Sequence, residues 1–100
     1  KGFDTCCPLG PVIETEFAVG SQSIRSTVNG DLKQDGTLDQ MIHSVAALVA
    51  YASAAFTLLP GDIILTGTPA GVGPIVNGDT VDITIEGIGT LSNPVRSIAT

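Results

Sequence analysis

The chain has 100 residues, which is enough for one domain with a single core. Hydrophobic residues make up 43% and charged residues 14%, a composition too apolar for disorder and poor in charge for a free-standing soluble domain, so we expect extra surface to be buried against a partner chain or further sequence. The net charge of −6, with four scattered cations, provides no basic stripe for nucleic acid and no patch for an anionic membrane surface.

The first twenty residues have the composition of an extended, loop-rich opening segment. Pro8 and the pair Gly10-Pro11 interrupt regular structure, and residues 12–17 form a run that predicts a short strand. Glu14 and Glu16 would share one face of that strand, so a site for a hard cation is one hypothesis. Two exposed acids at a strand edge are the commoner explanation of this spacing.

The two cysteines, Cys6 and Cys7, are adjacent. Neighbouring residues of an extended segment point to opposite faces, so a bond between them is disfavoured, and no C-x-x-C metal or redox pattern is present. We interpret both as reduced, buried thiols of a cytoplasmic protein. Because the chain starts with Lys1 rather than Met and carries no secretory signal, we also expect further residues upstream.

A hairpin is predicted next. Residues 24–28 alternate apolar and polar side chains, and the pair Asn29-Gly30 tolerates the positive φ angles of a two-residue turn. The second strand should therefore extend to about Gln34.

A long helix should follow the hairpin. Thr37 and Gln40 have the spacing of a capping box, and apolar residues then recur at steps of three and four. These patterns predict a helix that begins at Thr37 and runs to about Leu58, where Pro60-Gly61 ends it.

Residues 41–59 contain no Asp, Glu, Lys or Arg, which raises the question of a membrane span. We reject it, because flanking cations are absent and the run contains serine, threonine and many alanines. His43 lies among apolar neighbours here without an identifiable catalytic partner, so a satisfied or half-exposed imidazole is the commoner explanation than a general base.

The last third of the chain predicts strands. Residues 62–66 read as a buried strand, and the small-residue loop 67–74 follows it. The pair Asn77-Gly78 then turns the chain, residues 81–86 alternate as a half-buried strand, and residues 90–95 form a final strand. The predicted fold class is α+β, mainly β, with one long helix.

The loop after Thr66 is the most informative local feature. Gly67, Gly71 and Gly73 allow a backbone to approach a ligand closely, and the Thr68 hydroxyl can donate or accept a hydrogen bond. The loop fits neither a Walker motif nor a dinucleotide fingerprint. Taken alone, it is compatible with a structural turn or with a ligand-binding loop.

Three stretches change the weight of these alternatives. They are residues 1–5 with 7–11, residues 28–30 with 34–36, and residues 60–74, which has the most specific pattern (PGDIILTGTPAGVGP). The tail 81–95 fits the same pattern. Together they resemble the C-terminal half of fumarylacetoacetate hydrolase family proteins over nearly the whole chain.

The resemblance implies a mixed β-roll, usually in a homodimer, with residues 1–100 forming the C-terminal part of one catalytic domain whose N-terminal part lies elsewhere. Family members hydrolyse, isomerise or decarboxylate small 2-oxo acids or 1,3-dicarbonyl compounds. They hold a divalent cation, Mg²⁺ or alternatively Mn²⁺ or Ca²⁺, through acidic residues that lie before the active-site lysine.

Functional residues carry over at three positions. Lys1 matches the family's active-site lysine, and Thr68 matches the threonine that binds the substrate carboxylate beside Gly67. The metal ligands are expected upstream of residue 1, so Glu14 and Glu16 do not match them. An alternative hypothesis is a non-catalytic β-roll module that uses its apolar helix for assembly.

Overall fold

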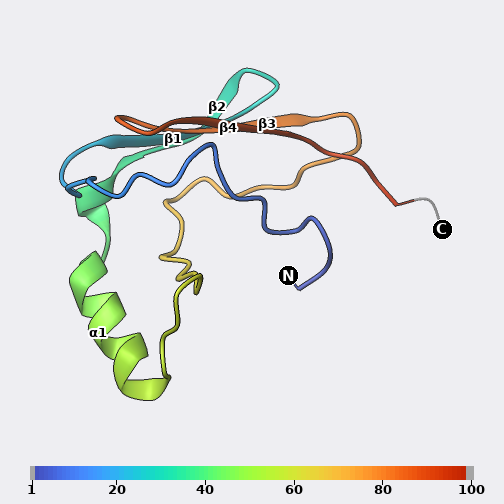
Figure 1. The fold of residues 1–100 in the computed structure, drawn as a ribbon. Helices are drawn as coiled ribbons and strands as arrows, with labels where there is room; N and C mark the ends of the chain where they lie inside the picture. The colour runs from blue at the N-terminus through green and yellow to red at the C-terminus, as the bar shows by residue number, and fades with distance from the viewer. Residues whose placement is uncertain (1, 99–100) are drawn as a thin grey trace.

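The computed structural model describes residues 2–98 and has an α+β architecture in which strands predominate, so the predicted fold class is confirmed (Figure 1). Four strands, one 3₁₀ turn and one α-helix follow one another along the chain. They are β1 (Ser23–Val28), β2 (Asp31–Thr37), the 3₁₀ turn Leu38–Gln40, α1 (Val45–Ala55), β3 (Thr80–Ile85) and β4 (Gly89–Pro94).

The four strands form one antiparallel sheet with the order β2-β1-β3-β4. The predicted hairpin is confirmed, because Asn29 and Gly30 take φ angles of 53° and 85° in the turn between β1 and β2. The strands predicted at residues 81–86 and 90–95 are also confirmed and pair as β3 and β4. Each hairpin is thus local in sequence, and the β1–β3 pairing joins the two halves of the chain.

A polar staple holds the β1–β2 turn against the turn that precedes β3. Asn29 Nδ2 donates to Asp79 Oδ1 at 2.8 Å, and Asn29 Oδ1 accepts from the Thr80 backbone N–H at 2.8 Å. The second carboxylate oxygen of Asp79 accepts from the Val76 N–H at 2.9 Å. The hydrogen bonds from Val76 and then from Asn29 lower the pKa of Asp79, because both favour the charged carboxylate.

The helix begins later than predicted. Gln40 Oε1 accepts from the Thr37 N–H at 3.1 Å, so the capping box closes only the short 3₁₀ turn, and Met41 is already extended. Ser44 is the residue that caps α1, since its Oγ accepts from the Ala47 N–H at 3.1 Å. The predicted start at Thr37 is therefore wrong.

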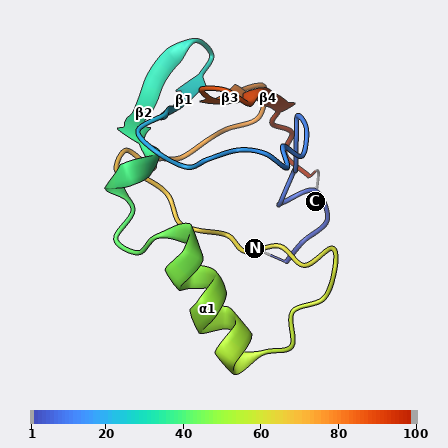
Figure 2. The same cartoon turned by 60° about the vertical axis from the view of Figure 1, so that its left-hand side comes forward.

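The helix also ends earlier than predicted, because Phe56 is extended. A tight turn follows, in which the Asp62 N–H donates to the Leu59 carbonyl at 3.0 Å and Asp62 Oδ2 accepts from the Leu59 N–H at 2.8 Å. Gly61 has a φ of 94°, which suits the third position of a turn that starts with Leu59-Pro60. Figures 1 and 2 show α1 projecting from the sheet and the chain returning from its far end toward the strands.

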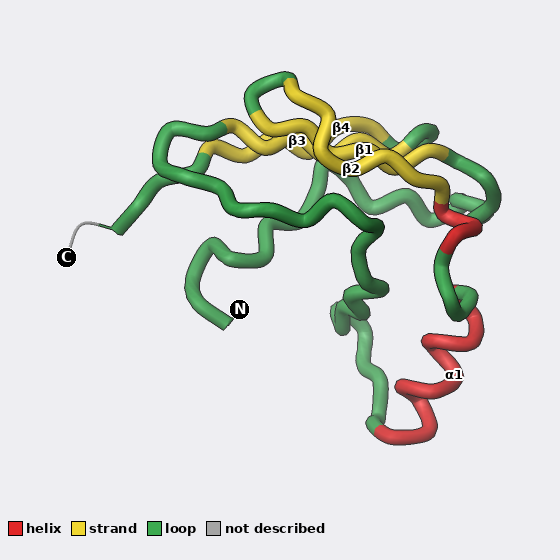
Figure 3. The backbone as a smooth tube through the Cα atoms, turned by 180° about the vertical axis from the view of Figure 1, so that it is seen from behind, coloured by secondary structure: helices red, strands yellow, loops and turns green. Residues whose placement is uncertain are grey.

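Two predicted strands, residues 12–17 and residues 62–66, are irregular in the structure (Figure 3). A strand needs a neighbour that satisfies its backbone groups, and the sheet formed within residues 2–98 provides no ladder partner for either segment. Both strand predictions are wrong within the described residues, although both segments are rich in apolar side chains.

No hydrophobic residue of the described range 2–98 is buried. Ile13 and Ile42 are more than nine-tenths exposed, and no residue of α1 is buried. Cys6 and Cys7 are free and exposed, which corrects the prediction that they are buried. Within the same range, no helix has the length and apolar character needed to cross a membrane. The apolar surface agrees with the expectation that additional chain covers this sheet and helix.

Candidate functional site

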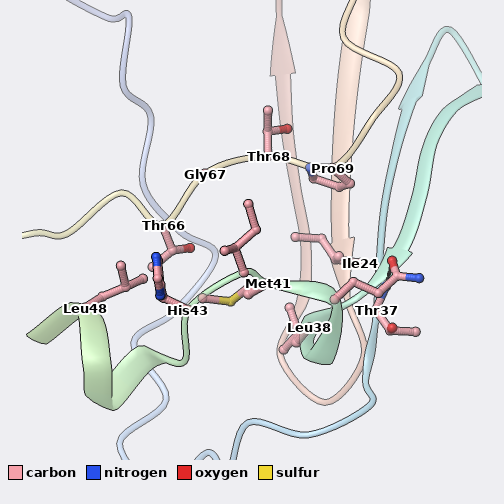
Figure 4. A pocket seen from close by; sticks show the side chains of 12 residues that line it. Ile24, Thr37, Leu38, Met41, His43, Leu48, Thr66, Gly67, Thr68 and Pro69 are labelled. Carbon is pink, nitrogen blue, oxygen red and sulfur yellow. Dashed lines mark hydrogen bonds between the residues drawn. The ribbon is translucent and has the colours of Figure 1, made fainter.

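The glycine-rich loop forms one side of a cavity of about 340 Å³. Thr66, Gly67, Thr68 and Pro69 line it from the loop. The opposite side comes from β1, the 3₁₀ turn, the segment that leads into α1 and the first half of α1 itself, with Ile24, Met41, His43 and Leu48 among its residues (Figure 4). The glycine-rich loop therefore lies at a concavity, and Gly67 and Thr68 are among the residues that line it.

Glycine is required in this loop for packing against the sheet. Gly71 has a φ of 106°, and a Cβ atom built there would lie 2.1 Å from the carbonyl oxygen of Lys33 in β2. No side chain fits at that distance, so the loop can touch the strand only through a residue that lacks one. Gly67 has a φ of 101° but open space around it, so its glycine serves the backbone conformation alone.

The Thr68 side chain is held by β2. Gln34 Nε2 donates to Thr68 Oγ1 at 2.6 Å and to the Pro69 carbonyl at 2.8 Å. Gln34 Oε1 in turn accepts from Ser26 Oγ of β1 at 2.9 Å, and Ser26 is only 7% exposed. A continuous set of hydrogen bonds thus runs from the centre of the sheet to the hydroxyl of Thr68, a residue that lines the cavity.

Gln34 is a site residue that the sequence interpretation missed. In the sequence it lies at the end of a hairpin and in a stretch that matches the family, but nothing local indicates which distant loop its amide contacts. Its place in the matched pattern 34–36 was the available signal.

Consecutive backbone donors complete the polar surface of the loop. Within residues 2–98, no hydrogen bond uses the backbone N–H of Gly67 or Thr68. Two free amides next to a hydroxyl suit a carboxylate, whose oxygens accept several hydrogen bonds at once.

His43 lines the same cavity, although its sequence neighbours indicate no catalytic partner for it. In Figure 4 its ring lies near Thr66, close to Met41 and Leu48. The imidazole is therefore part of the cavity wall. The sequence does not reveal this position, because the loop residues next to His43 in space are distant from it in the chain.

The described residues do not form a metal centre. Among residues 2–98, no group of three or more His, Cys, Asp or Glu side chains is arranged to hold a metal ion. Glu14 and Glu16 are exposed, and Glu14 Oε1 accepts from the Glu16 backbone N–H at 3.0 Å. Both acids are exposed as the commoner explanation expected, but they lie in a local turn and not at the edge of a strand.

Lys1 lies outside the described residues. Its distance from Thr68 is not part of this structure, and its catalytic role therefore stays a prediction. The substrate-binding roles of Gly67 and Thr68 likewise stay predictions, although both residues line the cavity.

The sequence matches the family model "Fumarylacetoacetate (FAA) hydrolase C-terminal" over residues 1–96. A crystal structure of 5-carboxymethyl-2-hydroxymuconate delta-isomerase from Mycobacterium smegmatis is 53% identical, with a TM-score of 0.97 over 100% of this chain and 40% of that one. The 2-hydroxyhepta-2,4-diene-1,7-dioate isomerase of Mycobacterium marinum is 60% identical, with a TM-score of 0.94 over 96% of this chain and 38% of that one.

Two further relatives differ in their reactions. A maleylpyruvate hydrolase from Sphingobium sp. SYK-6, solved in complex with manganese(II) and pyruvate, is 42% identical, with a TM-score of 0.88 over 94% of this chain and 37% of that one. The oxaloacetate tautomerase YcgM of Escherichia coli is 46% identical over 87% of this chain and 41% of its own length. The chain thus spans about two fifths of the relatives that it matches.

Proposed function

The chain belongs to the fumarylacetoacetate hydrolase family, and on that premise we propose that it provides the carboxylate-binding part of an enzyme acting on small 2-oxo acids or 1,3-dicarbonyl compounds. The observation that carries the proposal is the placement of Thr68 and Gly67 at a cavity, with the Thr68 hydroxyl held by Gln34. Pyruvate in one relative and oxaloacetate in the name of another are both 2-oxo carboxylates, which supports the substrate class.

The proposed work of the loop is to bind and orient. The Thr68 hydroxyl and the backbone N–H groups of Gly67 and Thr68 would donate to the carboxylate and fix its angle in the cavity. Fixing the carboxylate also fixes the adjacent keto group, on whose oxygen negative charge develops when an enolate forms. Lys1 would place an ammonium charge beside that developing oxyanion.

We also propose that a divalent cation, Mg²⁺, Mn²⁺ or Ca²⁺, is held mainly by residues upstream of residue 1. The manganese complex of the maleylpyruvate hydrolase supports this part of the proposal. Residues 2–98 do not provide a group of side chains that fits a metal by themselves. Hydrolysis, isomerisation, tautomerisation and decarboxylation would each start from a bound substrate carboxylate, and binding this carboxylate is the part that this chain would supply.

The experiment uses the full-length protein and a panel of oxaloacetate and acylpyruvate substrates. Lys1→Ala should lower turnover by roughly a hundredfold while circular dichroism stays unchanged, because removing one group that stabilises an oxyanion commonly has that effect. Lys33→Ala removes the other lysine of the chain, which is exposed on β2, and is the matched control. Unchanged turnover in Lys1→Ala would contradict the role of the lysine.

A non-catalytic module is the second candidate, and the exposed helix favours it. Every residue of α1 is at least partly exposed, which suits assembly as well as it suits burial by upstream chain. Calorimetric titration of the full-length protein with oxalate, with and without Mg²⁺, separates the candidates. An enzyme of the proposed class should give metal-dependent heat, and a structural module should give none.

We propose, finally, a cytoplasmic homodimer. The reduced, exposed thiols of Cys6 and Cys7 support a reducing compartment, and the exposed apolar residues of α1 support an interface with a second copy. Light scattering of the full-length protein measures the oligomeric state, and a monomer at micromolar concentration would overturn the assembly.

A further inference from the structure

We propose that Gln34 is a positioning residue that orients the Thr68 hydroxyl, so that the hydroxyl hydrogen is reserved for the ligand. This inference rests on the proposed function of Thr68 as a carboxylate-binding residue. It follows from the hydrogen bonds of three side chains, Ser26, Gln34 and Thr68, together with the Pro69 carbonyl.

The orientation of the Gln34 amide is determined by its partners. The Pro69 carbonyl oxygen can only accept, so the amide atom 2.8 Å from it must be Nε2. The other end, Oε1, therefore faces Ser26 Oγ at 2.9 Å. Because Oε1 can only accept, Ser26 must be the donor in this pair.

The two amide hydrogens are then both assigned. One lies on the bond to the Pro69 carbonyl, and the other lies on the 2.6 Å bond to Thr68 Oγ1. Thr68 Oγ1 is consequently an acceptor toward Gln34, and a hydroxyl has only one hydrogen of its own. That hydrogen remains available to donate to a carboxylate in the cavity.

The sheet makes this arrangement rigid. Ser26 and Gln34 are direct cross-strand partners of β1 and β2, and Ser26 is the buried polar residue of the described range. On the other side, Gly71 brings the loop so close that a Cβ atom there would meet the Gln34 Cγ at 3.2 Å. Gln34 is thus confined between the strand pair and the loop, and its amide has little freedom to turn.

A correctly oriented hydroxyl donor stabilises the bound carboxylate equally in the substrate complex and in the transition state. Loss of the orientation should therefore raise KM and the inhibition constant of oxalate while changing kcat little. A change of about tenfold corresponds to a single hydrogen bond to a charged group.

The experiment measures oxalate inhibition and oxaloacetate KM for full-length Gln34→Met, Thr68→Ala and the double variant. Gln34→Met keeps the side-chain length and removes every hydrogen bond of the side chain, while the backbone bonds of β2 remain. We expect each single variant to weaken oxalate by about tenfold, and we expect the double variant to be no weaker than Thr68→Ala, because no hydroxyl is left to orient. Gln22→Met is the matched control, since within residues 2–98 the Gln22 side chain hydrogen-bonds only to nearby backbone of residues 18–20.

Other outcomes separate the two proposals. If the two substitutions add fully, Gln34 only anchors the loop, and the positioning role is overturned. If Thr68→Ala weakens oxalate and Gln34→Met does not, the positioning role fails and the proposed function stands. If Thr68→Ala has no effect, the proposed function fails as well.

A milder variant covers the case in which Gln34→Met does not fold. Ser26→Ala removes the donor that fixes Gln34 Oε1 and so weakens the hold on the amide orientation without removing the bonds of Nε2, and oxalate should bind a few-fold more weakly. Binding equal to that of the unmodified protein, with the fold intact, would overturn the inference by a second route.

Discussion

At the scale of single residues, Gly71 is the glycine of the described range that leaves the least room for a side chain. A Cβ atom there would lie 2.1 Å from the Lys33 carbonyl oxygen, and the φ angle of 106° already disfavours any other residue. The neighbouring atom is backbone of a paired strand, so it cannot move away cheaply. The contact between loop and strand therefore depends on one missing methyl group.

We predict that Gly71→Ala in the full-length protein lowers the free energy of unfolding by at least about 2 kcal/mol and weakens oxalate by more than tenfold. The physical reason is that the loop must leave β2 and takes Thr68 with it. Gly73→Ala is the control, because Gly73 has open space around it and no left-handed φ, and it should have a small effect. Equal effects of the two variants would contradict the prediction.

A second residue-scale prediction concerns Asp79. Its pKa is lowered from 3.8 in the folded protein by the Val76 N–H and by Asn29, so its contribution to stability is complete above pH 3.8 and is lost as the pH falls through the lower folded-state value. Asp79→Asn should therefore destabilise the protein at neutral pH, and the difference from the unmodified protein should shrink below pH 3.8.

Urea unfolding of both proteins across this range measures the effect. Asp31→Asn changes an exposed aspartate at the start of β2 and serves as the control, with little change in stability expected. A difference for Asp79→Asn that grows on acidification would refute the assignment.

The sequence predicted some site residues and not others, for a physical reason. Gly67 and Thr68 could be found because the loop motif is contiguous. Gln34 and His43 could not, because each meets the loop only after the chain has folded. Gln34 lies 34 positions before Thr68, and the helix α1 separates His43 from the loop.

At the scale of elements, α1 shows how one capping pattern can serve two structures. Thr37 and Gln40 satisfy the same backbone donors in a 3₁₀ turn as they would in an α-helix. The capping pattern therefore indicates a helical turn at this place, but it does not indicate whether the turn continues as an α-helix. Ser44 is the residue whose oxygen fixes the true start.

We predict that Ser44→Ala lowers the free energy of unfolding by about 1 kcal/mol, because the Ala47 N–H loses its partner. Ser53→Ala is the matched control, since Ser53 is an exposed residue inside α1 where alanine is the better helix former. Chemical unfolding of the full-length variants measures both. A larger loss for Ser53→Ala than for Ser44→Ala would show that the capping assignment is wrong.

Strands were predictable where a turn fixed the pairing and not elsewhere. Asn29-Gly30 and the glycines after β3 specify which residues meet, so both hairpins were found from local chemistry. Residues 12–17 and 62–66 have a strand-like composition, but a ladder requires a second segment, and local composition does not reveal whether one is within reach.

At the scale of the whole molecule, the described chain has a well-paired sheet without a buried apolar core. Backbone hydrogen bonds contribute little net stability without such burial, because water competes for the same groups. The described residues should therefore depend for their stability on a covering surface, from further sequence or from a partner chain.

We predict that residues 1–100, expressed alone, show no cooperative heat-absorption peak and bind a hydrophobic dye, whereas the full-length protein shows a peak and binds little dye. Differential scanning calorimetry and dye fluorescence measure the two properties. A sharp transition of the isolated segment would show that the exposed surface is not the limiting factor.

The pairing of β1 with β3 also sets the order of events during synthesis. The first hairpin can close within microseconds once it leaves the ribosome, but its inner edge has no partner until residue 85 has been made. Because protein synthesis adds roughly five to twenty residues per second, the wait lasts seconds. During this time the unpaired edge of β1 can pair with other nascent chains. A codon change that slows translation between residues 37 and 80 should therefore increase aggregation without altering a single side chain.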